Sequence, residues 1–207
     1  DHSTISRFRA KLLKKNLMEK ILREINNQLE EFGLLIKTGV IVDATTVSSS
    51  RHPQKTIEVK EIAKDREEPE EEVIKTYSKD TDATWLVKGK KVVYGYKCHV
   101  ATDKAGYMLG GIVTGANESD TKNLSKVLDK VDLEDEAEVL CDKGYSSKAN
   151  DELLSEKELK NRIMKKAVKG KKLKESEKNY NKKISKVRYI IEQGFGLLKR
   201  WYGFGKM

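Results

Sequence analysis

Apolar positions in the first part of the chain recur at steps of three and four residues, the spacing that places side chains on one helix face. This pattern predicts a helix over residues 6–32, and Gly33 is a usual residue for its end. The spacing of the apolar positions then changes. Residues 40–45 form a short apolar run that contains a single carboxylate, Asp43, and this is typical of a buried strand.

The next segment, residues 48–91, is polar and almost without periodicity, so it predicts a charged surface insertion after the first strand. A short helix around the glutamate run at 67–72 is an alternative for part of it. Residues 92–102 then alternate between apolar and polar positions, and a turn leads to a returning strand at 107–114. These two runs predict a β-hairpin.

The rest of the chain alternates between strand and helix patterns. Apolar runs predict strands at 137–141 and 159–164, and helical spacing predicts helices at 123–131, 147–155 and 181–200. A hairpin followed by alternating strands and helices predicts an α/β fold, with a mixed sheet flanked by helices.

Charge and composition narrow the possible functions. The 207 residues carry a formal charge of +9, and residues 156–207 hold 17 Lys and Arg against 5 acids. Such a basic region attracts polyanions, nucleic acid first, although a solvated lysine-rich surface is the alternative.

No apolar run approaches the ~20 residues of a membrane span. The two cysteines cannot form a disulfide framework, so we expect a cytoplasmic protein, and the three histidines add no zinc-ligand spacing.

Two carboxylates, Asp43 and Asp142, stand at strand positions inside apolar runs. Burying a carboxylate costs several kcal/mol unless something compensates it, and a metal ion is a common compensation. For Asp142 the alternative is a strand-end residue that caps a turn, because Lys143-Gly144 follows.

A third acid, Glu192, lies in the last predicted helix between two cations. At 100° per residue, Arg188, Glu192 and Lys199 share one strip beside the apolar face. An exposed Arg–Glu pair of a few tenths of a kcal/mol is the alternative reading. Together with the two aspartates, however, Glu192 would complete a cluster suited to Mg²⁺ or Mn²⁺. Two such ions can promote phosphoryl transfer, with Arg188 and Lys199 gripping DNA phosphates.

Five motifs, in this order and at these spacings, make the chain resemble the DDE transposases of bacterial insertion sequences, most of all insertion-sequence family five within the family-four-like group. They are Val42-Asp43-Ala44-Thr45, Gly95-Tyr96-Lys97-Cys98-His99, Thr114-Gly115-Ala116-Asn117 with Asp120, Cys141-Asp142-Lys143-Gly144-Tyr145, and Arg188-x3-Glu192-x6-Lys199. Ser185 stands where the family's helix signature has a tyrosine.

The resemblance implies an RNase H-like catalytic domain over residues 38–207, with Asp43, Asp142 and Glu192 as its metal-binding triad. It also implies that residues 1–37 are a helical remnant of an N-terminal DNA-binding region, and a first residue other than Met fits a chain cut from something longer.

Lys97 and His99 share a strand face and could approach DNA or the site, with a satisfied sheet histidine as the alternative.

The expected function is divalent-metal-dependent cleavage at element ends and strand transfer, performed by a homodimer on terminal inverted repeats and target DNA at the bacterial nucleoid. Two alternatives stay open. One is a silent or repurposed DNA-binding protein, and the other is a related metal-dependent nuclease that does not join strands.

Overall fold

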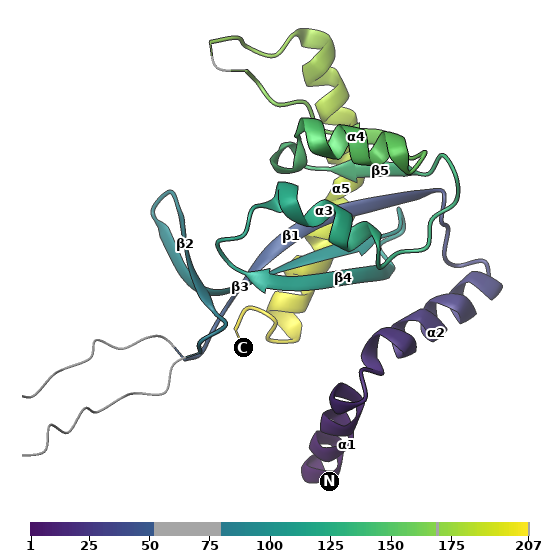
Figure 1. Cartoon of the computed structure of the whole chain (residues 1–207), viewed down its shortest axis with the longest axis vertical. Helices are drawn as coiled ribbons and strands as arrows, with labels where there is room; N and C mark the ends of the chain where they lie inside the picture. The colour runs from purple at the N-terminus through teal and green to yellow at the C-terminus, as the bar shows by residue number, and fades with distance from the viewer. Residues whose placement is uncertain (52–79, 169, 207) are drawn as a thin grey trace, which may run out of the picture.

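The computed structural model describes residues 1–51, 80–168 and 170–206. A mixed sheet forms its centre (Figure 1). The central strand, β1 (Gly39–Ser48), pairs antiparallel with β3 (Lys91–Thr102), which in turn pairs antiparallel with β4 (Met108–Gly115). On its other side β1 pairs parallel with β5 (Glu138–Cys141), and β5 pairs parallel with β6 (Lys160–Ile163).

Helices cover both faces of this sheet. α3 (Asp120–Leu128) and α4 (Lys148–Glu156) follow β4 and β5 in the chain and pack on one face. The long α5 (Glu175–Trp201) crosses the other face. The strand order β4-β3-β1-β5-β6, with only β3 antiparallel to the neighbouring β1 and β4, is that of an RNase H-like sheet. The predicted fold class is therefore confirmed.

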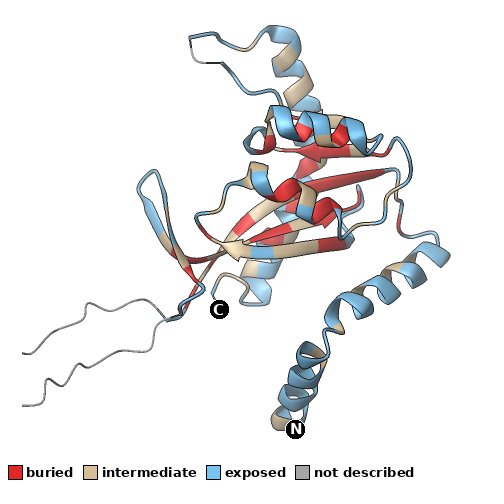
Figure 2. Cartoon of the chain, in the orientation of Figure 1, coloured by how far each residue is buried: buried red, intermediate tan, exposed pale blue. Residues whose placement is uncertain are grey.

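The alternation of side chains along β1 and β5 divides the core into two parts. Val40 and Val42 of β1 and Val139 of β5 belong to the cluster under α3 and α4, whereas Ile41 and Leu140 belong to the cluster under α5. Successive strand residues point to opposite faces, so both strands are buried on both sides, as their near-continuous apolar runs require. Figure 2 shows this burial concentrated on the sheet.

The N-terminal segment differs from the single helix predicted over residues 6–32. It forms α1 (His2–Lys14) and α2 (Met18–Glu31), and Asn16 between them has a φ of 52°. A left-handed residue breaks a helix, and Asn tolerates that conformation better than most residues. Neither helix contains a buried residue. Figure 1 shows α1 extending away from the sheet, whereas α2 contacts β4 through the hydrogen bond that Asn26 Nδ2 donates to the Leu109 carbonyl at 3.1 Å.

The predicted insertion also contains a strand that polar composition concealed. β2 (Thr84–Lys88) forms a hairpin with the start of β3, and Gly89 in its turn has a φ of 61°. The alternative short helix at 67–72 lies outside the described residues.

The last helix begins at Glu175 rather than at the predicted residue 181. At this observed start, Glu177 accepts a hydrogen bond from the backbone N–H of Lys174 at 2.7 Å. None of the helices in the described part of the chain has the length and apolar character that a membrane crossing requires.

Candidate active site

Strand register brings the first two predicted acids side by side. Val42 of β1 pairs with Cys141 of β5 in the parallel ladder. Asp43 and Asp142 are the next residues along the two strands, so they lie side by side where β5 ends and β1 continues to Ser48. The two-residue strand period also places Asp43 on the face of Ile41, and Asp142 on the face of Leu140. That face is the one that α5 covers.

Apolar packing then fixes the third acid. Ile184, Ile191 and Phe195 of α5 are buried against Ile41 and Leu140, in one cluster. This contact anchors the helix across the two acid-bearing strands. The flank of the same helix presents Arg188 and, one turn later, Glu192 toward the ends of those strands.

All three acids approach one buried guanidinium. Arg188 Nη2 donates to Asp43 Oδ2 at 2.7 Å and lies 3.6 Å from Glu192 Oε1, and its Nη1 lies 3.8 Å from Asp142 Oδ1. The side chains differ in exposure: Arg188 is 6% exposed and Asp43 17%, but Asp142 is 40% and Glu192 53% exposed. The cluster is therefore closed at Arg188 and open to solvent at Asp142 and Glu192.

The electrostatics of this cluster are unbalanced. Three carboxylates surround one cation, which leaves a formal charge of −2 beside a sheet edge. Burial raises the pKa of Asp43, while the Arg188 guanidinium and the Ala44 N–H, which donates to Asp43 Oδ1 at 2.8 Å, oppose that rise. Arg188 Nη1 also lies 3.6 Å from Met164 Sδ, and its Nε has no hydrogen-bond partner among the described residues.

The donor chemistry of the cluster fits a divalent cation. Carboxylate oxygens are the ligands that Mg²⁺ and Mn²⁺ prefer, and a net negative charge favours their binding. In the conformation described, the acids contact the guanidinium rather than one another. Accordingly, within residues 1–51, 80–168 and 170–206 no three Asp, Glu, His or Cys side chains stand at ligand spacing.

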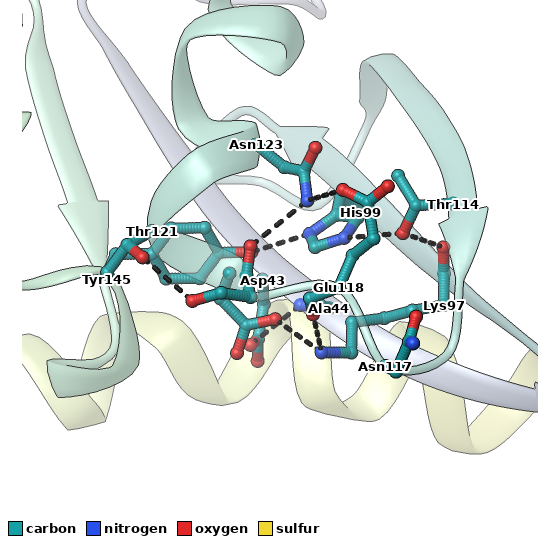
Figure 3. A network of polar contacts seen from close by, with 12 residues as sticks. Asp43, Ala44, Lys97, His99, Thr114, Asn117, Glu118, Thr121, Asn123 and Tyr145 are labelled. Atoms are coloured by element: carbon teal, nitrogen blue, oxygen red, sulfur yellow. Dashed lines mark hydrogen bonds and ion pairs between the residues drawn. The ribbon is translucent and has the colours of Figure 1, made fainter. Parts of the chain in front are cut away.

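Lys97 and His99 share a face, as predicted, but it is the face under α3 rather than the face of the triad. Figure 3 shows His99 between Tyr145 and Thr114, with its Nδ1 3.2 Å from the Tyr145 hydroxyl and its Nε2 3.3 Å from Thr114 Oγ1. His99 is 0% exposed, and burial lowers its pKa to about 4. An enclosed ring would have to become exposed before it could reach a phosphate, so this placement favours the alternative of a satisfied sheet histidine, and the DNA contact of His99 stays a prediction.

Lys97 is tied into the fold as well. Its Nζ donates to the Glu118 carbonyl at 2.5 Å and to Asp120 Oδ1 at 3.0 Å, so it connects β3 to the start of α3 (Figure 3 shows its contact with Glu118). Its side chain is 12% exposed. A DNA contact of Lys97 would have to replace these bonds.

The remaining two cations occupy different positions along α5. Arg188 faces the carboxylates instead of the surface, so its predicted grip on DNA phosphates would require it to leave them. Lys199 is half-buried near Cys98, and this burial lowers its pKa. Its contact with DNA stays a prediction.

One acid beside the cluster received no role from sequence reasoning. A Cβ built at Gly144 would lie 3.3 Å from Asp120 Oδ2 and 3.8 Å from Asp142 Oδ2, so the two carboxylates flank the same glycine. Asp120 is also the partner of Lys97. The signal was present, since Asp120 closes the third motif of the resemblance, but its position next to Asp142 depends on the fold.

The RNase H-like sheet and its edge of acids point to a class of protein, and comparison with known families identifies it. The family model of the transposase DDE domain matches residues 35–207, so the chain belongs to this family. The prediction of a DDE-type transposase, an enzyme class that acts on DNA, is confirmed at this level.

Among individual relatives, the chain is 35% identical over 203 residues to the transposase for insertion sequence element IS1106 of Neisseria meningitidis serogroup B, covering 97% of this chain and 68% of the relative. Among solved structures it is similar to the crystal structure of the Mos1 strand transfer complex, with a TM-score of 0.33 and 11% identity. That similarity covers 86% of this chain, which spans 60% of the Mos1 chain.

Proposed function

We propose that this protein is a DNA transposase that cleaves DNA at the ends of its element and transfers the strands to target DNA, with Mg²⁺ or Mn²⁺ as cofactor. The observation that supports this proposal best is the convergence of Asp43, Asp142 and Glu192 on one point at the sheet edge. The first and last of these acids, Asp43 and Glu192, are 149 positions apart along the chain (192 − 43), and only folding brings them together.

Asp43, Asp142 and Glu192 would hold the metal, as one ion or as the pair that the sequence predicts. When bound, a divalent cation supplies positive charge that favours deprotonation of an attacking water or 3′-hydroxyl and offsets charge on the leaving oxygen. Arg188 neutralises part of the cluster from its buried side. The solvent-exposed side, formed by Asp142 and Glu192, is where DNA would enter.

The chain between β6 and the first turns of α5 is basic, which suits a polyanion. The segment from Lys165 to Lys174 and the first turns of α5 carry an excess of lysines over acids. Such a field raises the local concentration of DNA and speeds its association at low salt. We further propose terminal inverted repeats and target DNA as the partners, and a homodimer as the form that pairs two DNA ends.

The direct test is cleavage of DNA that bears the element's own terminal repeats, in Mg²⁺ and in Mn²⁺. Asp43→Asn, Asp142→Asn and Glu192→Gln should each reduce cleavage more than about 100-fold, since even indirect partners of a metal commonly cost 10–100-fold. Glu138→Gln, the same chemical change at a carboxylate at the opposite end of β5, should cleave like the unaltered protein. Retained DNA binding in EDTA shows that each variant is folded.

Undiminished cleavage by all three triad variants would refute the site. A second arm uses precleaved ends and a target plasmid, and joining of the two is expected. Cleavage without joining would instead assign the protein to the nucleases, and binding without either reaction would assign it to the silent DNA-binding proteins.

A further inference from the structure

A groove of about 600 Å³ lies beside the carboxylate cluster, between α5 and the segment that follows β6. Six residues line it: Met164, Asn181, Lys182, Ser185, Lys186 and Tyr189. The groove shares one residue with the surroundings of the site, because Met164 Sδ is also the 3.6 Å neighbour of Arg188 Nη1.

Two hydrogen bonds hold the groove's outer wall in place. Asn181 Oδ1 accepts from the Lys165 N–H at 2.7 Å, and Asn181 Nδ2 donates to the Lys165 carbonyl at 3.0 Å. One side chain thus binds both polar groups of a backbone residue that follows β6. These bonds connect the segment after β6 to the start of α5 beside the groove.

Two lysines along the groove carry charges that no described residue neutralises. Lys182 and Lys186 have no hydrogen bond or ion pair with any described residue, whereas Lys104, Lys130 and Lys157 each contact a carboxylate within 3.0 Å. Their charges are available for an external anion. The two lysines are four residues apart on a helix, so they lie on the same side of α5.

Tyr189 continues this row toward the site. Its side chain is 58% exposed, and it makes no hydrogen bond, ion pair or ring contact with a described residue. Ser185, Tyr189 and Glu192 are spaced by four and three residues, which places them on one strip of the helix. The exposed ring of Tyr189 therefore lies one turn before Glu192, and the small side chain of Ser185 lies one turn before the ring.

We propose that this groove binds the unpaired end of a DNA strand, with Lys182 and Lys186 on its phosphates and Tyr189 stacked on a base. This inference rests on the proposed function, which places DNA at the adjoining carboxylates. An exposed aromatic ring beside a row of unpaired cations is the combination with which proteins hold single-stranded nucleic acid. An acidic peptide would use the lysines but has no need of the ring.

The experiment uses the full chain in EDTA, which removes catalysis, and a DNA duplex with a three-nucleotide single-stranded tail that carries 2-aminopurine. Stacking on Tyr189 should quench the 2-aminopurine fluorescence in the unaltered protein and in Tyr189→Phe, but not in Tyr189→Leu. Affinity of Tyr189→Leu should fall about tenfold, the low end for loss of one stacked base. Tyr202→Leu, which removes an exposed tyrosine at the end of α5, is the matched control and should change neither quantity.

The lysines have their own readout. The double variant Lys182→Gln/Lys186→Gln should lower the slope of log affinity against log salt by about 1.4, because each contact with a single strand contributes about 0.7. Lys148→Gln/Lys157→Gln removes the same charge at the first residue of α4 and at the residue after its end, on the opposite face of the sheet, and should leave the slope unchanged.

The proposal is overturned if Tyr189→Leu keeps the quenching, if Tyr202→Leu loses it equally, or if a glutamate oligomer of equal charge competes as well as the tailed DNA. These outcomes are separable from failure of the proposed function. Cleavage in Mg²⁺ with unchanged quenching in Tyr189→Leu refutes the groove alone, whereas quenching without any cleavage refutes the transposase chemistry alone.

Discussion

The short strand β5 begins at one ion cluster and ends at another, and the two clusters have opposite balances of charge. At its start, one carboxylate, Glu138, accepts from Lys104 Nζ at 2.7 Å and from Arg162 Nε at 2.9 Å. These side chains are 30–43% exposed. At its end, one guanidinium, Arg188, faces three carboxylates and is 6% exposed.

The Glu138 cluster is suited to holding neighbouring segments together, whereas the Arg188 cluster is suited to binding. The Glu138 cluster has a small positive excess that water can screen, and the two cations lower the pKa of Glu138 so that its charge is kept. The Arg188 cluster has a negative excess where water is partly excluded, and burial raises the pKa of Asp43 there. An unbalanced, half-buried cluster is costly for stability alone, and this cost supports the proposal that a further cation binds there.

The largest expected effect comes from removing the central guanidinium. Arg188→Met should lower the free energy of unfolding by about 3 kcal/mol in EDTA, because it leaves a buried carboxylate without its partner. Urea unfolding measures this, and added Mn²⁺ should restore more stability to the variant than to the unaltered protein. A loss below about 1 kcal/mol would show that the cluster is no more demanding than a surface pair.

The two ends of the sheet should also respond to acid in different ranges. Burial holds the pKa of His99 near 4, below its ordinary 6.5. The unfolded chain therefore binds a proton between these values that the folded chain does not, and stability falls as pH drops from about 6.5 to 4, by up to about 3 kcal/mol. His99→Gln should remove most of this slope in urea unfolding at pH 7, 5.5 and 4. An unchanged slope would contradict the burial of a neutral His99. The Glu138 end, with its lowered pKa, should lose its contribution only below about pH 4.5.

The smallest effect is expected at the start of β5. Arg162→Met removes a contact of similar length to that of Arg188, at 2.9 Å, but its side chain is 43% exposed. It should lower the free energy of unfolding by less than about 1 kcal/mol. That difference should shrink further in 1 M salt, since salt screens exposed charges. A loss equal to that of Arg188→Met would remove the distinction between the two clusters.

Much of the sheet could be predicted because its strands are apolar and short. The runs around Val42 and Leu140 require burial on both faces, and the acids that end them were visible as exceptions to that pattern. β2 was not visible, because an edge strand with exposed residues at Trp85 and Val87 has little apolar periodicity. The break at Asn16 could not be predicted either, because the apolar residues keep their helical spacing on both sides of it.

The position of Arg188 shows the limit of a one-dimensional reading. Its strip with Glu192 follows from helix geometry, but its 2.7 Å contact with Asp43, 145 residues away, depends on how α5 crosses the sheet. The same holds for His99. Strand alternation placed it with Lys97, but the pattern could not say which face would meet α3 and which would meet α5.

Calorimetry with Mn²⁺ is the decisive measurement for the proposed metal site, because it needs no knowledge of the DNA sequence recognised. The unaltered protein should give a binding heat that is lost in Asp43→Asn, Asp142→Asn and Glu192→Gln and kept in Glu138→Gln. Equal binding by all of these variants, or no binding by the unaltered protein at millimolar Mn²⁺, would contradict it.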